Sequence, residues 1–543
     1  MAMIRALVKH AIAACGATFI AFNIAAAQSL GLVPGRDVPE WLESWSPLAQ
    51  QGDLPRRLPS ASTATPLLLL PLPRIGLFWS GGNPAALAWD VTDSRADISA
   101  VRALQDGELR RPLDPASSAL TQLTGMGWQP LPKLGAGIGR VTFGRDVRDP
   151  SSVSDLNEPY PSSPFVITDT TVTALRRTRA RLEAAGGWRV GGWGLGVALG
   201  HDARNTATVA APFARRNRAV FSAATVGLSR ASADGRYQVG ARAQLKGGEE
   251  TVGLSEIAEQ GIVFELVGYR EVPVRDIQGF YTRRVTREVR SGGIGAAARV
   301  GRGQVVVFAD ATRSRERPTS QQRDNPASDL WATSGGMGGI SAQFPLFADR
   351  VLFAANGRFT KLSGRAKQVL LSPTGFDADE RALEGSVEAR YSPATAPWMG
   401  VAKLSLLSDR RERNDSVAQA NTVIQGTTPG AAVELGRRLG VRLLIVGGYA
   451  ISAYSGSGTI PSAASRGPVY RRLIAPELAI ATTGTRAQAF SFAARYAPRE
   501  SAAVWVAGRS EIFSSDNASG SLVPLGNRTA NTIWVGVTLG GGS

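Results

Sequence analysis

The chain has 543 residues and carries 61 lysines and arginines against 44 aspartates and glutamates, a formal net charge of +17. Its length suffices for several domains or for one large barrel, and its 61 glycines favour an all-β chain over a helical one. The basic residues stand singly within strand-like segments and do not cluster with aromatic residues as in a nucleic-acid binder. We therefore expect no nucleic-acid partner, and the excess charge fits a basic lumen or a basic rim facing anionic lipopolysaccharide.

The first residues predict a cleaved secretory signal peptide over 1–27. Arg5 and Lys9 precede an apolar stretch over 11–24, which ends in small residues up to Ala27; this order is typical of a secretory signal. A retained anchor would need a longer apolar run, and a lipoprotein signal cleaved at Cys15 would leave almost no apolar region before the cysteine. Cleavage after Ala27 removes two positive charges and lowers the net charge from +17 to +15.

Cys15 is the only cysteine and lies in the predicted signal, so we expect no disulfide and no thiolate metal site in the mature chain. Neither a nucleotide-binding loop nor an HExxH pattern occurs in the sequence. The sequence therefore predicts no metal site and no cofactor.

From about residue 96 the chain repeats segments of about ten residues that alternate apolar with polar or small side chains. In 193–200 and 237–245, for example, every second residue is apolar, as in strands that put one face to lipid and the other to a wet interior. The predicted lipid-facing residues are Trp193, Leu195, Val197, Leu199, Tyr237, Val239, Ala241, Ala243, Leu245, Val351, Phe353, Ala355, Phe359, Leu383, Gly385, Val387, Ala389, Tyr391, Ile533, Val535, Val537 and Leu539. A soluble sandwich would also alternate, but Tyr391, Trp398 and Tyr496 at strand ends suit an aromatic girdle at a membrane surface.

Short connections alternate with long polar ones along the whole of this region, as in barrels with short periplasmic turns and long outer loops. The sequence thus predicts an all-β fold: a transmembrane antiparallel up-and-down β-barrel of about 18 strands (16 to 20). We expect three parts, a signal peptide over 1–27, a periplasmic extension or partial plug over 28–95, and the barrel over 96–543. Such a chain belongs in the outer membrane of a Gram-negative-type bacterium, where its partners are membrane lipid, lipopolysaccharide and the barrel-assembly machinery; its oligomeric state stays open.

Four short segments resemble a family of uncharacterised bacterial outer-membrane β-barrels that carry a domain of unknown function, over about residues 75–540. They are 78–85 (FWSGGNPA), 163–170 (SPFVITDT), 186–193 (GGWRVGGW) and 256–261 (EIAEQG) with 279–281 (GFY). The Asn-Pro-Ala of 83–85 is also similar to the start of fatty-acid-transport barrels. The resemblance implies a barrel fold and an outer-membrane location, and it implies no activity.

One pair of residues raises the alternative of a barrel hydrolase. His201 is the only histidine beyond the predicted signal and stands next to Asp202 at the outer end of a strand, where such a pair can act as a general base. A nucleophile or a positioned water would also be needed, and spacing identifies neither. A solvated loop histidine explains the residue equally simply, so we assign no catalytic residue and keep His201 and Asp202 as weak candidates.

Charged residues spaced two apart predict ladders on one face of a strand. If these residues face the lumen and stay unpaired, they would line a ladder that selects ions. If arginines and glutamates pair across neighbouring strands, they would form a structural network that fills the barrel. The candidates are Arg177, Arg179, Arg181, Glu183, Arg284, Glu288, Arg290, Glu384, Glu388 and Arg390.

The connection over 247–278 holds five glutamates and an apolar stretch. It either folds inward and constricts a pore or forms a short external helix. A calcium site is disfavoured because the acidic residues lack the alternating oxygen spacing that such sites use.

Three functions are compatible with these features. The first is a passive channel or transporter for small solutes, with anions preferred because the lumen is expected to be basic. The second is a structural or surface-attachment barrel that acts through outer loops containing Arg315, Arg317, Arg410, Arg411 and Arg413, and the third is the His201–Asp202 hydrolase.

Overall fold

The computed structural model describes most of the chain beyond residue 75. The described ranges are 76–78, 80–109, 116–131, 135–152, 163–169, 172–208, 215–255, 263–273, 280–320, 329–347, 350–368, 372–393, 396–462, 466–499, 501–515 and 526–540. The predicted signal peptide and most of the predicted periplasmic extension lie outside these ranges, so both stay predictions.

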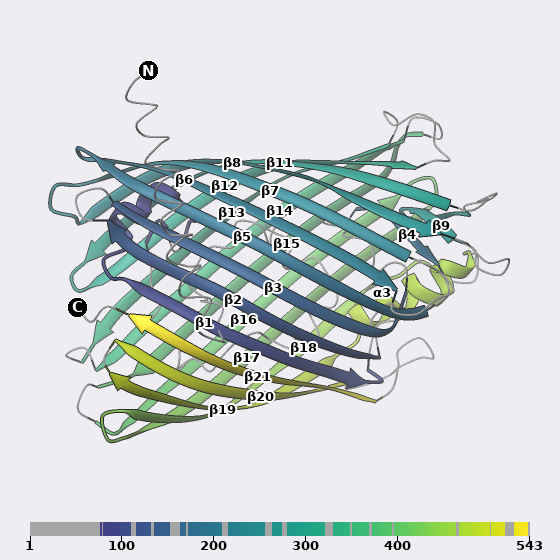
Figure 1. Ribbon diagram of the computed structural model, residues 1–543. Coiled ribbons are helices and arrows are strands. Elements are labelled where there is room, and N and C mark those ends of the chain that lie inside the picture. The colour runs from purple at the N-terminus through teal and green to yellow at the C-terminus, as the bar shows by residue number, and fades with distance from the viewer. Residues whose placement is uncertain are drawn as a thin grey trace.

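Eighteen strands within the described ranges form one closed antiparallel barrel, which confirms the predicted fold class (Figure 1). Each strand pairs with its neighbours in chain order, and β1 closes the ring by pairing with both β2 and β21. The barrel strands are β1 (Arg95–Gly107), β2 (Ser117–Leu131), β3 (Gly135–Ser152), β5 (Val172–Val190), β6 (Trp193–Thr208), β7 (Arg215–Ala231), β8 (Tyr237–Ser255), β11 (Phe280–Val300), β12 (Gly303–Ser320), β13 (Asp329–Leu346), β14 (Val351–Gln368), β15 (Ser372–Tyr391), β16 (Trp398–Asp415), β17 (Ala420–Leu439), β18 (Leu443–Thr459), β19 (Thr485–Arg499), β20 (Ala502–Ser515) and β21 (Asn527–Gly540).

The alternating residues of the sequence form the outer and inner faces of the barrel wall. In β6 the residues with odd numbers from Trp193 to His201 are exposed, while those with even numbers from Gly194 to Asp202 are buried inside. Large apolar side chains on the outer surface include Leu199, 53% exposed, and Leu245, also 53% exposed. A band of exposed apolar side chains around a closed barrel is what contact with lipid requires, so the predicted lipid-facing sides of β6 and β8 are confirmed.

Short and long connections lie at opposite ends of the barrel. The hairpins of the short-turn end include Gly191 and Gly301, whose φ values of 61° and 59° favour glycine. Tyr391, Trp398 and Tyr496 stand on the outer surface near this end and are 42%, 53% and 47% exposed, as an aromatic girdle predicts.

The long-loop end carries additional structure that packs over the mouth of the barrel (Figure 1). It consists of a three-stranded sheet, β4 (Phe165–Asp169), β9 (Val263–Val267) and β10 (Arg270–Pro273), and of two short helical segments, η5 (Tyr470–Ile474) and α3 (Ala475–Ala481). In the connection predicted over 247–278, the described residues form the end of β8 and the hairpin β9–β10 and contain no helix. Residues 256–262 and 274–278 lie outside the described ranges, so the expectation of a short external helix stays a prediction there.

Ahead of β1, two short helical turns, η3 (Pro84–Ala86) and α2 (Leu87–Asp90), lie inside the barrel near the short-turn end. In the part of the chain that the structure describes, no helix has the length and apolar character needed to cross a membrane.

Candidate functional site

The lumen is the candidate functional site, and its short-turn end holds residues 76–78 and 80–91, here called the inner segment. The segment lies so close to the wall that the facing positions on four neighbouring strands, β5 to β8, are glycines. A Cβ at Gly196 would overlap the Ala85 nitrogen, and a Cβ at Gly187 would come within 2.6 Å of the Pro84 carbonyl oxygen. The wall thus forms a seat shaped for the backbone of 83–85.

Polar side chains fix the segment on this seat. Asn83 donates to the carbonyl oxygens of Leu228 and Ala241 at 3.1 and 3.2 Å, and its own oxygen caps η3 by accepting from Ala85 N. Further along, Arg189 donates to the Ala88 carbonyl at 2.7 Å. These bonds satisfy buried polar groups that would otherwise be costly to bury.

An apolar cluster surrounds the seat. Leu77, Phe78 and Leu87 are at most 1% exposed and pack with side chains such as Met126 and Ile138 of the wall. Complete burial of a large apolar side chain contributes about 1.5–3 kcal/mol relative to exposure. The inner segment is therefore a packed part of the lumen.

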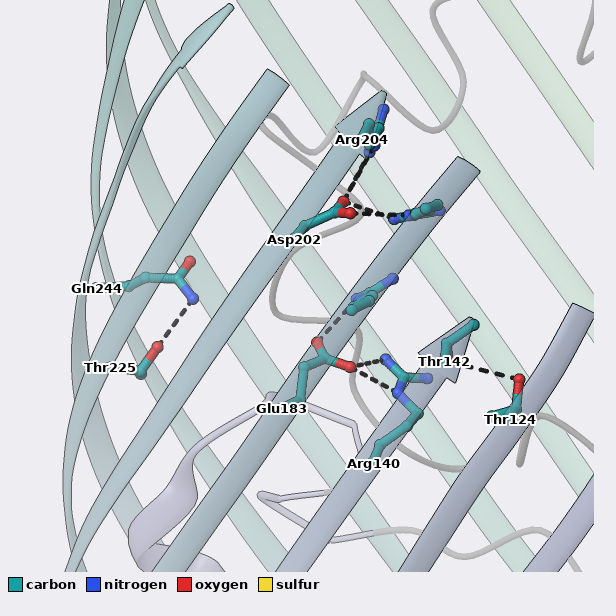
Figure 2. A network of polar contacts seen from close by, with 10 residues as sticks. Thr124, Arg140, Thr142, Glu183, Asp202, Arg204, Thr225 and Gln244 are labelled. Atoms are coloured by element: carbon teal, nitrogen blue, oxygen red, sulfur yellow. Dashed lines mark hydrogen bonds and ion pairs between the residues drawn. The ribbon is translucent and has the colours of Figure 1, made fainter. Parts of the chain in front are cut away.

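Above the inner segment, the wall formed by β3, β5 and β6 carries two neighbouring ion-pair clusters, which Figure 2 shows from close by. Glu183 accepts from Arg140 at 2.6 Å and from Arg181 at 2.8 Å. Asp202 accepts from Arg179 at 2.8 Å and from Arg204 at 2.9 Å. The planar guanidinium groups suit such shared carboxylates.

This wall, here called the basic wall, keeps an excess of positive charge. Its four arginines share two carboxylates, which leaves a formal charge of +2 in these clusters. Arg177 adds another cation and donates to the hydroxyl of Thr206. The predicted ladder of Arg177, Arg179, Arg181 and Glu183 does face the lumen; its role as an ion filter stays a prediction.

The facing wall, formed by β14 to β17 and called the mixed wall, carries charges of both signs. Glu384 pairs with Arg358, and Glu388 pairs with Arg390 at 3.1 Å. The burial alternation of β15 places Glu384, Glu388 and Arg390 on its inward face; their role in selectivity stays a prediction. A cavity of about 570 Å³ lies along this wall and continues to Arg509 and Glu511 of β20.

The long-loop end carries β4, β9, β10, η5 and α3, here called the outer cap. Its buried core joins Tyr269 and Tyr470 of the cap to Trp331 and Phe376 of the wall, and the Tyr269 ring meets that of Phe376 edge to face at 6.1 Å. The loop over 247–278 thus folds inward in its described part, one of the two alternatives that its sequence leaves open.

Side-chain hydrogen bonds tie the outer cap to the wall. The carboxylate of Asp415 accepts from Tyr269 N at 3.0 Å, and the hydroxyl of Tyr269 donates to Thr422. The hydroxyl of Tyr454 donates to the Ala481 carbonyl, and Arg283 donates to the Phe165 carbonyl at 2.8 Å. Every part of the cap therefore has at least one bond to a barrel strand or packs on a part that has one.

His201 and Asp202 do not form a catalytic pair. Successive residues of a strand point to opposite faces, so His201 is exposed on the outer surface while Asp202 is buried in the lumen. His201 Nδ1 lies 3.0 Å from the hydroxyl of Ser222, and both oxygens of Asp202 are held by arginines. The geometry offers no general base at this position.

Arg284, Glu288 and Arg290 of β11 do not face the lumen as predicted. In this strand Val285, Arg287 and Val289 point inward and are buried, so the residues with even numbers point outward. The alternation with a period of two was predicted correctly, but the outward face was taken for the inward one. Both faces of this part of β11 carry charged residues, so the pattern alone does not tell them apart.

The arginines assigned to outer loops also lie elsewhere. Arg315 and Arg317 stand on the outer surface of β12, and Arg410 stands on that of β16. Arg411 and Arg413 of β16 face the lumen, where they approach Asp409 and Glu380.

The sequence reasoning missed two groups of functional residues. The glycine seat was not predicted because glycine content alone does not say which backbone approaches which strand. The lumen residues Arg140 and Arg204 were missed because neither belongs to a longer run of charged residues spaced two apart, and only the pairing of β3 with β5 and of β5 with β6 brings them to Glu183 and Asp202.

No protein-family model matches the sequence, and no curated protein matches it. Solved structures with a similar fold include the unliganded ferric citrate transporter FecA (9% identity, 83% of this chain and 78% of that chain, TM-score 0.40) and the siderophore receptor PirA from Acinetobacter baumannii (7%, 83% and 81%, 0.37). The copper transporter OprC is a third (11%, 82% and 80%, 0.35). At this distance the likeness adds nothing beyond a large β-barrel, and the predicted resemblance to an uncharacterised barrel family stays a prediction.

Among the residues that the structure describes, no group of three or more histidine, cysteine, aspartate or glutamate side chains could hold a metal ion.

Proposed function

We propose that the protein is a passive outer-membrane channel that conducts small anionic solutes. The observation that carries the proposal is the unequal charge of the two lumen walls. On the basic wall, the two described clusters hold four arginines, Arg140, Arg179, Arg181 and Arg204, with the carboxylates of Glu183 and Asp202. On the mixed wall, by contrast, glutamates and cations are paired one to one.

The physical reason is the focusing of charge in a confined space. A low-dielectric wall with an excess of one sign concentrates ions of the opposite sign, and selectivity in barrel pores depends on rings or ladders of charged side chains. An eighteen-stranded ring is also wide enough to enclose an aqueous path. The exposed apolar band supports placement in a membrane, with the short-turn end on the periplasmic side.

Reversal potentials in planar bilayers test the proposal. The protein is expected to pass chloride in preference to potassium, and replacing Arg177, Arg179 and Arg181 together by glutamine is expected to lower this preference severalfold. The matched control replaces Arg313, Arg315 and Arg317 of β12, which carry the same charge on the outer surface. A pore that selects cations, or one in which both triple variants behave alike, contradicts the proposal.

A barrel closed for transport, which acts through its outer surface, is the second candidate. The outer cap favours it, because its aromatic core fills the long-loop end. Absence of conductance from folded, inserted protein, even in variants that weaken the cap, supports this candidate against the channel.

A further inference from the structure

The outer surface of the barrel carries a groove of about 730 Å³ between β11, β12, β13 and β14. Its rim holds Arg290, Arg313, Arg315 and Lys361, and its floor is made of small residues that leave room for a ligand. The floor residues that point outward are Gly292, Ala311, Ser334 and Gly336.

The groove lies where the apolar band ends. Nearer the short-turn end, the same outward faces present Ile294, Val307, Ile340 and Phe359, which are 68%, 46%, 49% and 49% exposed. A cation facing lipid at the middle of the bilayer is strongly destabilising, and the cost falls towards the headgroups. The change from apolar to basic residues therefore marks the boundary between hydrocarbon and headgroups on the long-loop side.

Two cations of the rim face each other across neighbouring strands. Arg290 of β11 stands directly opposite Arg313 of β12, and like charges in such cross-strand pairs are destabilising. Within the described residues, Arg313, Arg315 and Arg317 make no ion pair, although all three are exposed. One carboxylate, Glu288, lies among these cations, opposite Arg315 and paired with Arg290, so the positive charge of the rim exceeds the negative charge. An anion in the groove would balance this excess.

On the neighbouring strands cations also stand opposite one another, as Arg381 does with Arg410, but each of these two has a carboxylate on its own strand. Arg381 of β15 pairs with Asp379 at 3.1 Å, and Arg410 of β16 pairs with Glu412. These cations are neutralised by residues of their own strand. In the groove the one lining carboxylate is Glu288, which pairs with Arg290, and Lys361 approaches Asp379 of β15 at 3.9 Å. Among the described residues, the rim cations without an ion pair are Arg313 and Arg315.

We propose that this outward groove binds the phosphorylated headgroup of a lipid in the outer leaflet, of the lipopolysaccharide type. Guanidinium groups bind phosphate oxygens in pairs, and clusters of basic residues beside a membrane surface recognise anionic lipids. The acyl chains would lie on Ile294, Val307, Ile340 and Phe359, directly below the cations. A free anion would use the rim but not this apolar surface.

Binding of diphosphorylated lipid A to the full-length protein in detergent micelles, followed by native mass spectrometry, tests the proposal. R313Q/R315Q is expected to lower the affinity at least tenfold, and removal of both phosphates from lipid A is expected to have a similar effect. A311L fills the floor without changing any charge and is also expected to weaken binding. R410Q, a paired cation on the same outer surface, is the matched control and should stay within twofold.

Competition with inorganic phosphate tests whether the groove binds a lipid or a free anion. It should not compete with lipid A at millimolar concentration; equal affinity for the two would overturn the assignment to a lipid. Unchanged binding by R313Q/R315Q, or by dephosphorylated lipid A, would overturn it as well. The proposal depends on the outer-membrane location but not on conduction, since the groove faces away from the lumen. Far-ultraviolet circular dichroism of R313Q/R315Q in the same detergent serves as the check that the variant is folded.

Discussion

The two ends of the lumen are filled in different ways. At the short-turn end, the inner segment meets the wall through backbone atoms that lie on glycines, with Asn83 as the main polar anchor. At the long-loop end, the outer cap meets the wall through side-chain groups of Tyr269, Asp415 and Tyr454. One contact is set by shape and the other by individual hydrogen bonds.

This difference determines how each end responds to change. A backbone seated without space for a Cβ tolerates no added atoms on the wall, because interiors at native packing density do not yield locally. A hydrogen bond contributes about 1 kcal/mol net, so a cap held by several of them can be loosened in steps. We therefore expect steric variants to act on the inner end and hydroxyl variants to act on the outer end.

The largest effect is expected from Gly196→Val. The new side chain would occupy the position of the Ala85 nitrogen and the Pro84 carbonyl carbon, so the inner segment should leave its seat. Expulsion should be visible as cleavage within residues 76–91 by added protease and as a severalfold larger conductance. The matched control is Gly447→Val, because a Cβ at Gly447 meets nothing within 4 Å. Protection of the segment in Gly196→Val would show that the seat does not hold it.

A second, smaller effect is a pH dependence of the inner segment at the short-turn end. Burial raises the pKa of Asp90, which belongs to the inner segment and not to a spanning strand, to about 7, against the opposing influence of the Phe78 N–H and of Arg299. A released segment would titrate near 3.8. Because the folded pKa is the higher one, the contribution of Asp90 is fully present below about pH 4, falls as the pH rises to about 7, and is lost above that.

Protease sensitivity of residues 76–91 should therefore increase between pH 4 and pH 7 and stay level above pH 7. Asp90→Asn keeps an acceptor for Phe78 N and should remove this dependence. Asp234→Asn, in an exposed turn where hydrogen bonding to Ser232 lowers the pKa, should leave the profile unchanged. A pH profile of Asp90→Asn that matches that of the unaltered protein would contradict this interpretation.

The comparison also shows what the sequence could and could not predict. The alternation in segments such as 193–200 and 237–245 correctly predicted the strands, their lipid-facing sides and the number of strands in the ring. Period two is a local property, and each segment reports it independently. Arg177, Arg179 and Arg181 were placed in the lumen for the same reason, since the other face of their strand is suited to lipid.

Two predictions were wrong or incomplete because they depend on more than the local sequence pattern. The outward part of β11 carries Arg284, Glu288 and Arg290 because it lies beyond the apolar band, and a rule made for the middle of the membrane assigned it to the wrong face. The inward folding of β9 and β10 depends on contacts with residues more than a hundred positions away, such as Asp415 and Thr422. No local pattern contains such contacts.

The smallest effect is expected from Tyr269→Phe at the outer end. The substitution keeps the ring that packs against Phe376 and removes only the hydroxyl that donates to Thr422. Loss of one buried hydrogen bond is worth about 1 kcal/mol, or roughly a fivefold change in an equilibrium. Openings of the outer cap, counted as transitions to the conducting level in single-channel recordings, should become about fivefold more frequent. Tyr449→Phe, on the outer surface and 40% exposed, should not change them. The inner segment should keep its resistance to protease, because its seat does not involve this bond; a loss of that resistance in Tyr269→Phe would mean that the two ends are coupled and not independent.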